Sequence, residues 1–381
     1  MRRVPLERAP PWLLITLALL AGLTCQLLIG TSYVAASLDP LREEGGVPIA
    51  FVNLDPGPHG ARLLASLRER ASPVAWVEVG SRDAAFEGLL QKRFFGAMVV
   101  PSNFSADLDS FASDRPRAAL IETYGNPGAS TSGSLIAGRA MELAVEATRE
   151  TVRERAIEAA TVGSTGLGAL TLDQARFIAM PVRVQHAEVN EVPPRGANGL
   201  APTYLAMAAW IGGYLGAIAL ERFRPLTKLG VAPRAALVAA AAGANGALAT
   251  LAALAVGLAA RDALELAMLL AVGTWMAYAL VALLTDVFGL AGILPAFAVL
   301  ALGLPASGAL YPAGLLPDLY RSLHAIDPFT WLVEGLRTTL YAPGAGDLAA
   351  HMTSLVLLAL ACTTTSLLLG WLRGRRAGRT A

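Results

Sequence analysis

The side chains that could catalyse a reaction are scattered through the sequence and form no recognisable site. The four histidines, His59, His186, His324 and His351, have no cysteine or carboxylate partners at the spacings that metal sites use. The sequence contains neither a Gly-x-x-x-x-Gly-Lys-Ser/Thr phosphate loop nor a Gly-x-Ser-x-Gly nucleophile motif. We therefore predict a protein without enzymatic activity of its own, without a metal and without a cofactor.

The charged residues argue against one class of partner and indicate one candidate site. The formal net charge of +1 argues against nucleic acid as a partner. Basic residues nevertheless gather with a proline in residues 222–234 (RFRPLTKLGVAPR), a short segment between two apolar runs. This segment has two interpretations: a signal that only fixes membrane topology, or a docking element for a cytoplasmic protein. Its candidate residues are Arg222, Arg224, Pro225, Lys228 and Arg234.

Six long apolar runs separate these polar groups, and they predict a polytopic α-helical membrane protein. With a hydrophobic content of 55%, the chain is too apolar for an ordinary soluble protein. A helix needs about 20 apolar residues to cross a bilayer. The predicted spans are residues 12–34, 201–220, 235–260, 263–285, 287–310 and 351–372.

The first run has two interpretations. Its basic flank is compatible with a cleaved signal peptide, but the run is longer than the roughly 7–15-residue apolar core of such peptides. We therefore favour an uncleaved membrane anchor.

The distribution of arginine and lysine predicts the orientation. With six spans, both termini lie on one side of the membrane together with segment 222–234. That side carries the basic residues Arg2, Arg3, Arg8, Arg222, Arg224, Lys228, Arg234, Arg373, Arg375, Arg376 and Arg379. By the positive-inside rule the termini are cytoplasmic, and residues 39–200 are extracytoplasmic. We expect the protein to lie in the lipid bilayer of the plasma membrane.

The centres of the predicted spans contain no ionisable residue, which argues against an ion-coupled carrier. Small residues at close-packing spacing, Gly212 with Gly216, predict helix–helix contact, and Gly243 with Ala247 repeats the pattern. Asn245 is predicted to form an interhelical hydrogen bond rather than a substrate contact. Two prolines, Pro295 and Pro305, are expected to kink the fifth span.

Residues 39–200 have the pattern of a soluble α/β domain. Runs rich in β-branched and aromatic residues predict strands at 47–53, 74–79, 95–101 and 118–124, with a last strand at 181–189. Helices are expected at 61–71, at 83–93 behind a Ser81 cap, and at 106–112 behind a Ser105 cap. A long helix is predicted at 131–160, with i,i+3 ion pairs on its solvated face.

Four blocks of sequence resemble the phage-infection-protein (YhgE/Pip) family, a branch of the type 2 ABC exporter permeases. They are IAFVNLDPG at 49–57, FFGAMVVPSNFSADL at 94–108, VNEVPPRGANGLAPTYLAMAAWIGGYLGA at 189–217 and ASGALYPAGLLPDLYRSLHAIDPFTWLVEGLRTTLY at 306–341. Many relatives carry a long helical insertion in the external domain, where this chain has only the helix at 131–160.

The resemblance implies a permease that pairs as a homo- or heterodimer and takes energy from a separate nucleotide-binding ATPase subunit. Segment 222–234 would then be the ATPase-coupling loop. The external segment 311–347, which carries an amphipathic helical pattern, would be the gate region. The gate residues implied are Tyr311, Pro312, Leu316 and Tyr320.

These observations predict three parts: residues 1–38 with the first span, the α/β domain 39–200, and the five-span domain 201–381. The expected function is that of the membrane subunit of an ABC-type exporter for an unidentified, possibly amphiphilic substrate. The alternative is a non-transporting scaffold or receptor whose external domain binds a partner.

Overall fold

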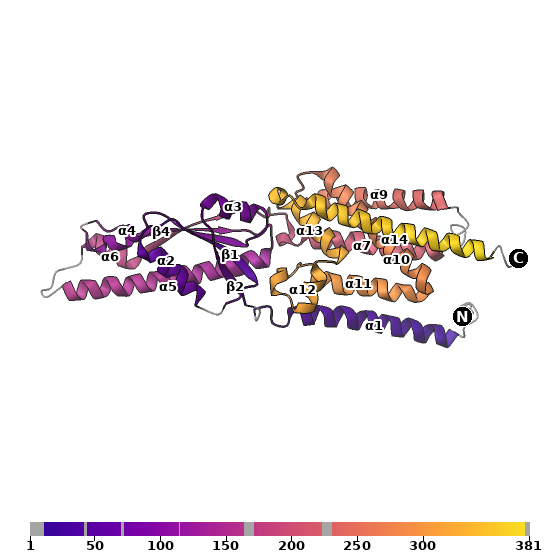
Figure 1. The fold of residues 1–381 in the computed structure, drawn as a ribbon, viewed down its shortest axis with the longest axis horizontal. Coiled ribbons are helices and arrows are strands. Elements are labelled where there is room, and N and C mark those ends of the chain that lie inside the picture. The colour runs from indigo at the N-terminus through magenta and orange to yellow at the C-terminus, as the bar shows by residue number, and fades with distance from the viewer. Residues whose placement is uncertain are drawn as a thin grey trace. The chain divides into compact units, whose positions relative to one another are not determined.

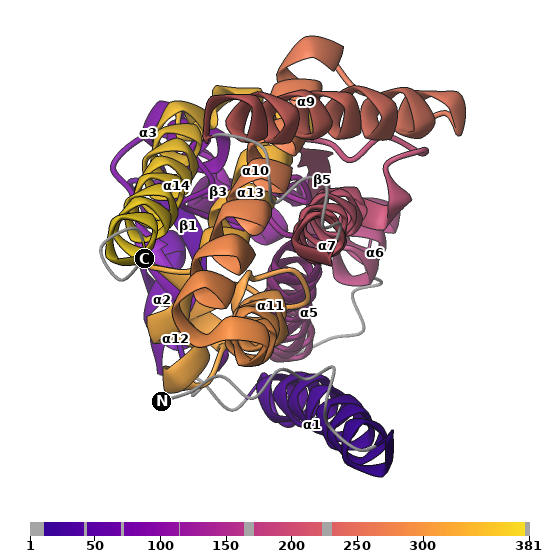
Figure 2. The ribbon, with the colours of Figure 1, turned by 90° about the vertical axis from the view of Figure 1, so that its right-hand side faces the viewer.

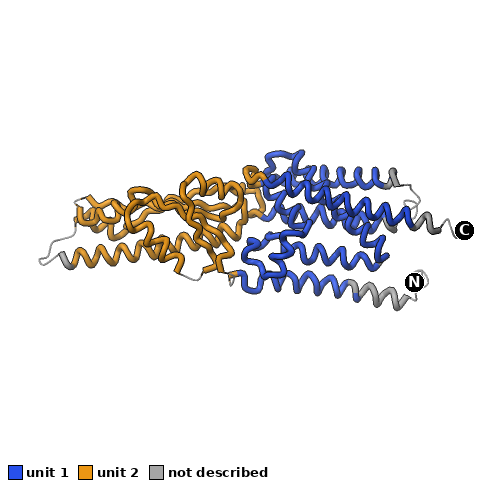
Figure 3. The backbone as a smooth tube through the Cα atoms, in the orientation of Figure 1, with its two compact units in different colours: residues 1–40, 200–340, 347–381 blue, residues 41–199, 341–346 orange. Residues whose placement is uncertain are grey.

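The computed structural model describes residues 11–41, 44–69, 72–113, 115–163, 171–222 and 231–377. The chain divides into two compact units, which Figure 3 shows in two colours. The helical unit comprises residues 1–40, 200–340 and 347–381, and the sheet unit comprises residues 41–199 and 341–346. The sheet unit thus includes the short segment 341–346, which the sequence prediction placed with the membrane part.

The sheet unit is built on a five-stranded sheet with the order β2-β1-β3-β4-β5. The strands are β1 (Val47–Asn53), β2 (Val74–Glu78), β3 (Gly96–Val100), β4 (Ala119–Gly125) and β5 (Val182–Glu188). β1 pairs with β2 and β3 in parallel, β3 with β4 antiparallel, and β4 with β5 in parallel. The five strands predicted from sequence are confirmed to within two residues at each end.

Helices cover both faces of this sheet. On one face α3 (Arg82–Leu90) packs against β1 and β3, and the core there contains Ala50, Val52, Leu89 and Val99. Because successive strand residues point to opposite faces, Gly96 faces the other side, where it lies under Ala137 and Met141 of the long helix α5 (Thr131–Gly163). Figure 1 shows α5 running along the sheet, beside α2 (Pro58–Arg68). The shorter α4 (Phe104–Asp109) and α6 (Leu172–Ala179) complete the unit.

A fully buried amide, Asn126, connects the end of β4 to its surroundings. Its Nδ2 donates to the backbone oxygens of Leu89 at 2.7 Å and Phe94 at 2.8 Å. Its Oδ1 accepts from Asn190 Nδ2 at 3.0 Å. One side chain therefore joins the end of β4 to the end of α3, to the loop that follows it and to Asn190, and its own polar atoms are satisfied as a buried polar group requires.

The local predictions in this unit had mixed outcomes. Ser81 does cap α3, since its side chain accepts from the backbone N–H of Ala84. The Ser105 cap is wrong, because α4 begins at Phe104 and the Ser105 hydroxyl instead donates to Asp55 Oδ2 at 2.5 Å. The ion pairs on α5 are confirmed, with Arg149–Glu146 at 3.1 Å and Arg153–Glu150 at 2.5 Å.

The helical unit contains eight helices among the described residues. They are α1 (Pro11–Ser37), α7 (Ala201–Arg222), α9 (Val231–Ala255), α10 (Ala263–Phe288), α11 (Ile293–Ala306), α12 (Asp318–His324), α13 (Pro328–Leu340) and α14 (Leu348–Ala377). The end-on view in Figure 2 shows α10 beside α14 and α9, and α10 also packs against α7 and α13.

Four of these helices are long and apolar enough to cross a membrane: α7, α9, α10 and α14. The 27-residue α1 has the length for a span, but most side chains in its first half lie outside the described part of the chain. The expected fifth span 287–310 is wrong as one continuous helix, because a 3-10 turn occupies Gly289–Gly292 and α11 has only 14 residues. Pro295 therefore falls in the first turn of α11, where its missing N–H leaves no hydrogen bond unmade.

Candidate functional site

The centre of the helical unit is held together by glycines that approach the backbone of α10. A Cβ on Gly213 of α7 would collide with the carbonyl oxygen of Thr274, and one on Gly246 of α9 would collide with that of Ala267. Small residues allow such close approach of helices within a bilayer, where the hydrophobic effect does not drive them together. Both glycines are therefore needed where they stand.

The glycines predicted from spacing, Gly212, Gly216 and Gly243, do not lie on the helix faces that contact α10. A Cβ on Gly212 would lie 2.6 Å from Asn245 Nδ2, so the Asn245 amide rests on the bare face of α7. At Gly216 and Gly243 an added Cβ would meet no atom within 4 Å. The structure thus brings Gly212 and Asn245 together across α7 and α9, and leaves open space at Gly216.

Three of the four residues implied as a gate converge in one apolar cluster. Leu316 and Tyr320 are buried with Ala36 of α1 and Ala306 of α11, and Tyr311 packs against them. The Tyr320 hydroxyl lies 3.4 Å from Ser32 Oγ of α1. Pro312 precedes the 3-10 turn Ala313–Leu315. The cluster joins segment 311–320 to the ends of α1 and α11.

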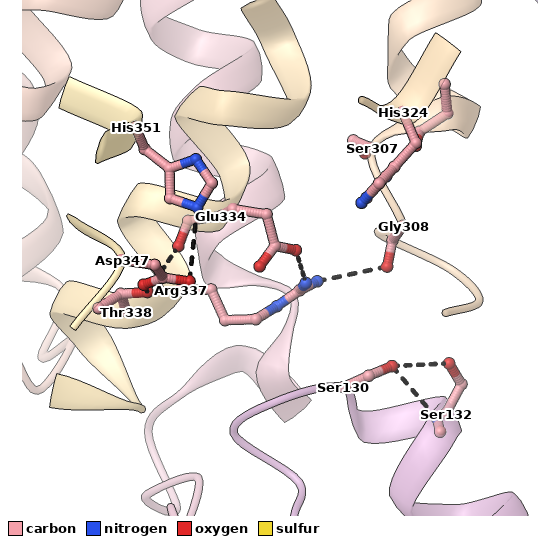
Figure 4. Close-up of polar contacts among 12 residues, drawn as sticks. Ser130, Ser132, Ser307, Gly308, His324, Glu334, Arg337, Thr338, Asp347 and His351 are labelled. Atoms are coloured by element: carbon pink, nitrogen blue, oxygen red, sulfur yellow. Dashed lines mark hydrogen bonds and ion pairs between the residues drawn. The ribbon is translucent and has the colours of Figure 1, made fainter. Parts of the chain in front are cut away.

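Two basic side chains that the sequence prediction passed over fix the end of α11. The ring of His324 bonds through Nδ1 to the Ala306 carbonyl at 2.7 Å. Arg337 is 6% exposed, pairs with Glu334, and donates through Nη2 to the Gly308 carbonyl at 3.3 Å (Figure 4). The last carbonyls of a helix have no partner within the helix, so these donors satisfy groups that would otherwise be buried unpaired. We call His324, Glu334 and Arg337 the α11 clamp.

A buried carboxylate begins α13. Asp327 is 6% exposed and accepts from the Thr330 backbone N–H at 2.9 Å and the Thr330 hydroxyl at 3.2 Å. Its Oδ2 lies against Gly303 of α11, where a Cβ would be only 2.6 Å away. Burial raises the pKa of Asp327 to about 6, although the hydrogen bonds from Thr330 and Phe329 oppose that shift.

A second polar group lies at the start of α14. Asp347 accepts from the Thr338 hydroxyl at 2.7 Å and lies 3.4 Å from His351 Nε2, so it links the end of α13 to α14 (Figure 4). Together with the α11 clamp, these contacts hold the two ends of α13 in place. The chain between α11 and α14 is thus anchored by specific polar bonds at both sides.

The predicted basic segment cannot be placed as a whole. Arg224, Pro225 and Lys228 lie outside the described residues, while Arg222 is the last residue of α7 and Arg234 belongs to α9. Segment 222–234 therefore connects α7 to α9, and its docking role stays a prediction.

A cavity of about 500 Å³ lies between α9, α10 and α14. Its walls are mostly apolar, with Val238 from α9 and Trp275 from α10 among them. Asp286, predicted to lie at a span end, is in its lining and accepts a hydrogen bond from the Ser366 hydroxyl. A cavity of this size and lining suits an apolar group better than a polar one.

The missed residues differ in whether the sequence carried a signal for them. Asp327 precedes Pro328 and stands three residues before Thr330, a pattern typical of a helix start. Gly213 and Gly246 carry none, because the helix face they occupy depends on how α7 and α9 are rotated toward α10.

Comparison with known proteins gives one match. The family model described as ABC-2 family transporter protein matches residues 11–368, a stretch that contains both units. In the comparison with curated proteins, no protein matches the chain.

Proposed function

Since this chain belongs to the ABC-2 family of transporter proteins and is the membrane permease component of such a transporter, we propose that it exports an amphiphilic substrate. It is a multi-pass membrane protein without a catalytic site, and the ATPase that drives it is a separate subunit. The family match, which begins in α1 and ends in α14, carries the transporter role, and the mostly apolar cavity between α9, α10 and α14 supports an amphiphilic substrate.

The proposed topology has six spans, with both termini cytoplasmic and residues 39–200 extracytoplasmic. The positive-inside rule supports it, because arginine and lysine are concentrated before α1, in segment 222–234, and in the last turns of α14 and beyond them. In this arrangement α1 and α11 supply the first and fifth spans. The four sequence blocks support placing the chain in the YhgE/Pip branch of the family.

The proposed gate is the apolar cluster of Tyr311, Leu316 and Tyr320 with Ala36 and Ala306. Its support is that segment 311–320 packs on α1 and α11 through apolar contacts and one weak hydroxyl contact, which can separate at modest cost. The α11 clamp, in contrast, is bound by charged and buried hydrogen bonds. Opening would therefore part α1 from the cluster while the clamp keeps α11, α12 and α13 together.

The proposed coupling element is segment 222–234, and the proposed assembly is a dimer of permeases with the ATPase bound on the cytoplasmic side. The test replaces Arg222, Arg224, Lys228 and Arg234 with Gln and measures both ATPase co-purification and ATP-dependent export from vesicles. A matched control removes the same number of charges from the C-terminal tail by replacing Arg373, Arg375, Arg376 and Arg379 with Gln.

We expect the loop variant to insert with unchanged topology, to lose the ATPase and to stop exporting, while the tail variant keeps both activities. A loop variant that still binds the ATPase and exports would show that these charges are not a docking element for the ATPase. A wild-type chain that binds no ATPase encoded beside it would favour a scaffold or receptor.

A further inference from the structure

The sheet unit contains a groove that runs along α5. Three hollows of about 310, 230 and 230 Å³ follow one another on this helix, lined in turn by α5 residues 136–144, 144–155 and 152–159. Neighbouring hollows share lining residues: Leu67 and Ala144 join the first two, and Leu108 and Val152 are among those that join the last two. The three hollows therefore lie next to one another along α5, and we call this row the groove.

The row of hollows is longer than an extended hydrocarbon chain and can therefore hold one. At 1.5 Å per residue, residues 136–159 of α5 extend over about 35 Å. One lipid chain occupies about half of the roughly 30 Å hydrocarbon core of a bilayer. The groove begins at Leu41, four residues after the end of α1 at Ser37.

The walls of the groove are apolar. Leu63 of α2 is 8% exposed, Leu108 of α4 is 7% exposed and Phe177 of α6 is 3% exposed. Each of them lines a hollow and leaves only an edge of its side chain accessible. An alkyl chain lying on these edges would remove that apolar surface from water, which is favourable.

The rim of the groove is positively charged at its middle. Arg62 of α2 and Arg155 of α5 both line the central hollow, both are exposed, and neither has an ion-pair partner within the described part of the chain. His59 lies beside them and contacts Asp109, 2.9 Å away, which is the only acidic residue among the described residues that line the three hollows. This charge pattern complements a negatively charged head group.

We propose that this groove binds an amphiphile with one long alkyl chain and an anionic head group, the chain along α5 and the head at Arg62 and Arg155. The proposal names the substrate class of the exporter and in that respect rests on the proposed function. The groove would receive the substrate on the extracytoplasmic side. Binding itself needs no ATPase, so the two can be tested apart.

The test uses the full chain in nanodiscs of phosphatidylcholine and a palmitic acid that carries a photoreactive diazirine in its chain. After illumination, mass spectrometry locates the adducts. We expect adducts on α2 and on residues 136–159 of α5. Adducts confined to the helical unit would overturn the proposal.

Two pairs of variants sharpen the test. Thr151→Trp fills the central hollow from an exposed position on α5 and should lower adduct yield about fivefold, whereas Ile157→Trp, on the same helix but outside the three linings, should leave it unchanged. Arg62→Gln with Arg155→Gln should lower it about threefold, whereas Arg68→Gln with Arg183→Gln, which removes as many charges elsewhere in the unit, should not.

A third comparison needs no substitution. The wild-type protein should capture the photoreactive acid several times better than the matching alcohol, and equal capture would overturn the assignment of an anionic head. If Thr151→Trp changes the oligomeric state and leaves the adducts unchanged, a second copy covers the groove and the proposal fails. Adducts in the groove without ATP-dependent export of the same acid would reject the export function alone.

Discussion

Two buried aspartates, one in each unit, have pKa values that are shifted in opposite directions. Asp55 in the sheet unit is 7% exposed and Asp327 in the helical unit is 6% exposed. Burial alone raises the pKa of a carboxyl group. At Asp55, burial is outweighed by hydrogen bonds from the side chain and backbone of Ser105 and from the backbone of Gly60 and Gly57, which lower the pKa. At Asp327 burial prevails, and the pKa rises to about 6.

The difference lies in where the hydrogen-bond donors come from. Asp55 is met by Ser105, which is 50 residues away in the chain and reaches it through both backbone and hydroxyl. Asp327 receives bonds only from residues at the start of its own helix, among the contacts described. In the sheet unit this polar bond joins distant segments, whereas in the helical unit α7 and α9 join α10 through the close approach of backbones at glycine.

The largest effect on stability is expected from the buried polar contacts of the sheet unit. Asn126→Ala removes the side-chain donor to the carbonyls of Leu89 and Phe94 and the acceptor of Asn190 Nδ2, and should destabilise the sheet unit by about 3 kcal/mol. Hydrogen exchange measured peptide by peptide reports each unit separately. The exposed Gln185→Ala on β5 is the control and should change exchange little. Equal protection in the two variants would contradict a role for Asn126 as the connecting residue.

The next effect tests the close approach of helices. Gly213→Ala should destabilise the helical unit by about 2 kcal/mol, because its Cβ meets a backbone oxygen that cannot move aside. Gly216→Ala on the same helix meets open space and should be neutral or stabilising by up to about 1 kcal/mol, since alanine favours helix. Thermal unfolding in detergent would reveal the opposite signs. A loss at Gly216 larger than that at Gly213 would place the contact on the other face of α7.

A smaller effect concerns pH. The folded-state pKa of Asp327, about 6, lies above the unfolded value, so its contribution to stability is present at low pH and is lost as pH rises through about 6. Between about pH 5 and pH 7.5 the wild type should lose about 1 kcal/mol relative to Asp327→Asn. Asp318→Asn, with a 96% exposed side chain, is the control. Parallel melting-temperature profiles for the wild type and Asp327→Asn would contradict the raised pKa.

Asp55 should show the opposite dependence. Its lowered pKa gives a contribution that is present above the unfolded value of about 3.9 and is lost as pH falls through the lower folded value. Asp55→Asn should therefore make the sheet unit less stable at neutral pH and less sensitive to acid. Exchange in peptides from β1 at neutral and acidic pH measures both effects.

The smallest effect is expected on the surface of α5. The Arg139–Glu142 pair is 2.5 Å apart but both side chains are about two-thirds exposed, at 65% and 68%. Glu142→Gln should change stability by no more than about 0.3 kcal/mol, because water and salt screen such pairs. Hydrogen exchange of α5 is the measurement, and a marked loss would show that the pair does more than lie on a solvated face.

The sheet unit was the easier part to predict from sequence. Strands such as Val47–Asn53 carry a dense run of β-branched and aromatic residues bounded by turn residues, so the local pattern is sufficient. Helix α6 was missed although Thr171 and Gln174 form a capping box that the sequence displays. The Ser105 prediction failed for another reason: the residue serves Asp55, and no local pattern reveals a partner so far away in the chain.

In the helical unit, spacing pointed to α7 and α9, and Gly212 does lie against Asn245, but spacing did not identify the glycine that meets α10. Gly212 and Gly216 satisfy the small-residue pattern, yet Gly213 makes the contact with α10. The choice depends on the rotation of α7, which no apolar periodicity fixes in a helix that is apolar on all sides. The same limit applies to Arg337, whose carbonyl partner at Gly308 is created by the way α11 ends.

The segment Tyr341–Gly346 decides whether the sheet unit can be moved as one continuous piece of sequence. The Tyr341 hydroxyl donates to the Gly196 carbonyl at 2.6 Å and is buried, and Gly344 lies against Leu90, so this segment is part of the sheet unit. The sheet unit is therefore discontinuous in the sequence. If residues 41–199 alone were transplanted into another permease, the unit would lose the buried Tyr341 side chain and its hydrogen bond to the Gly196 carbonyl. An exchange that preserves the unit must therefore move both segments, 41–199 and 341–346, together.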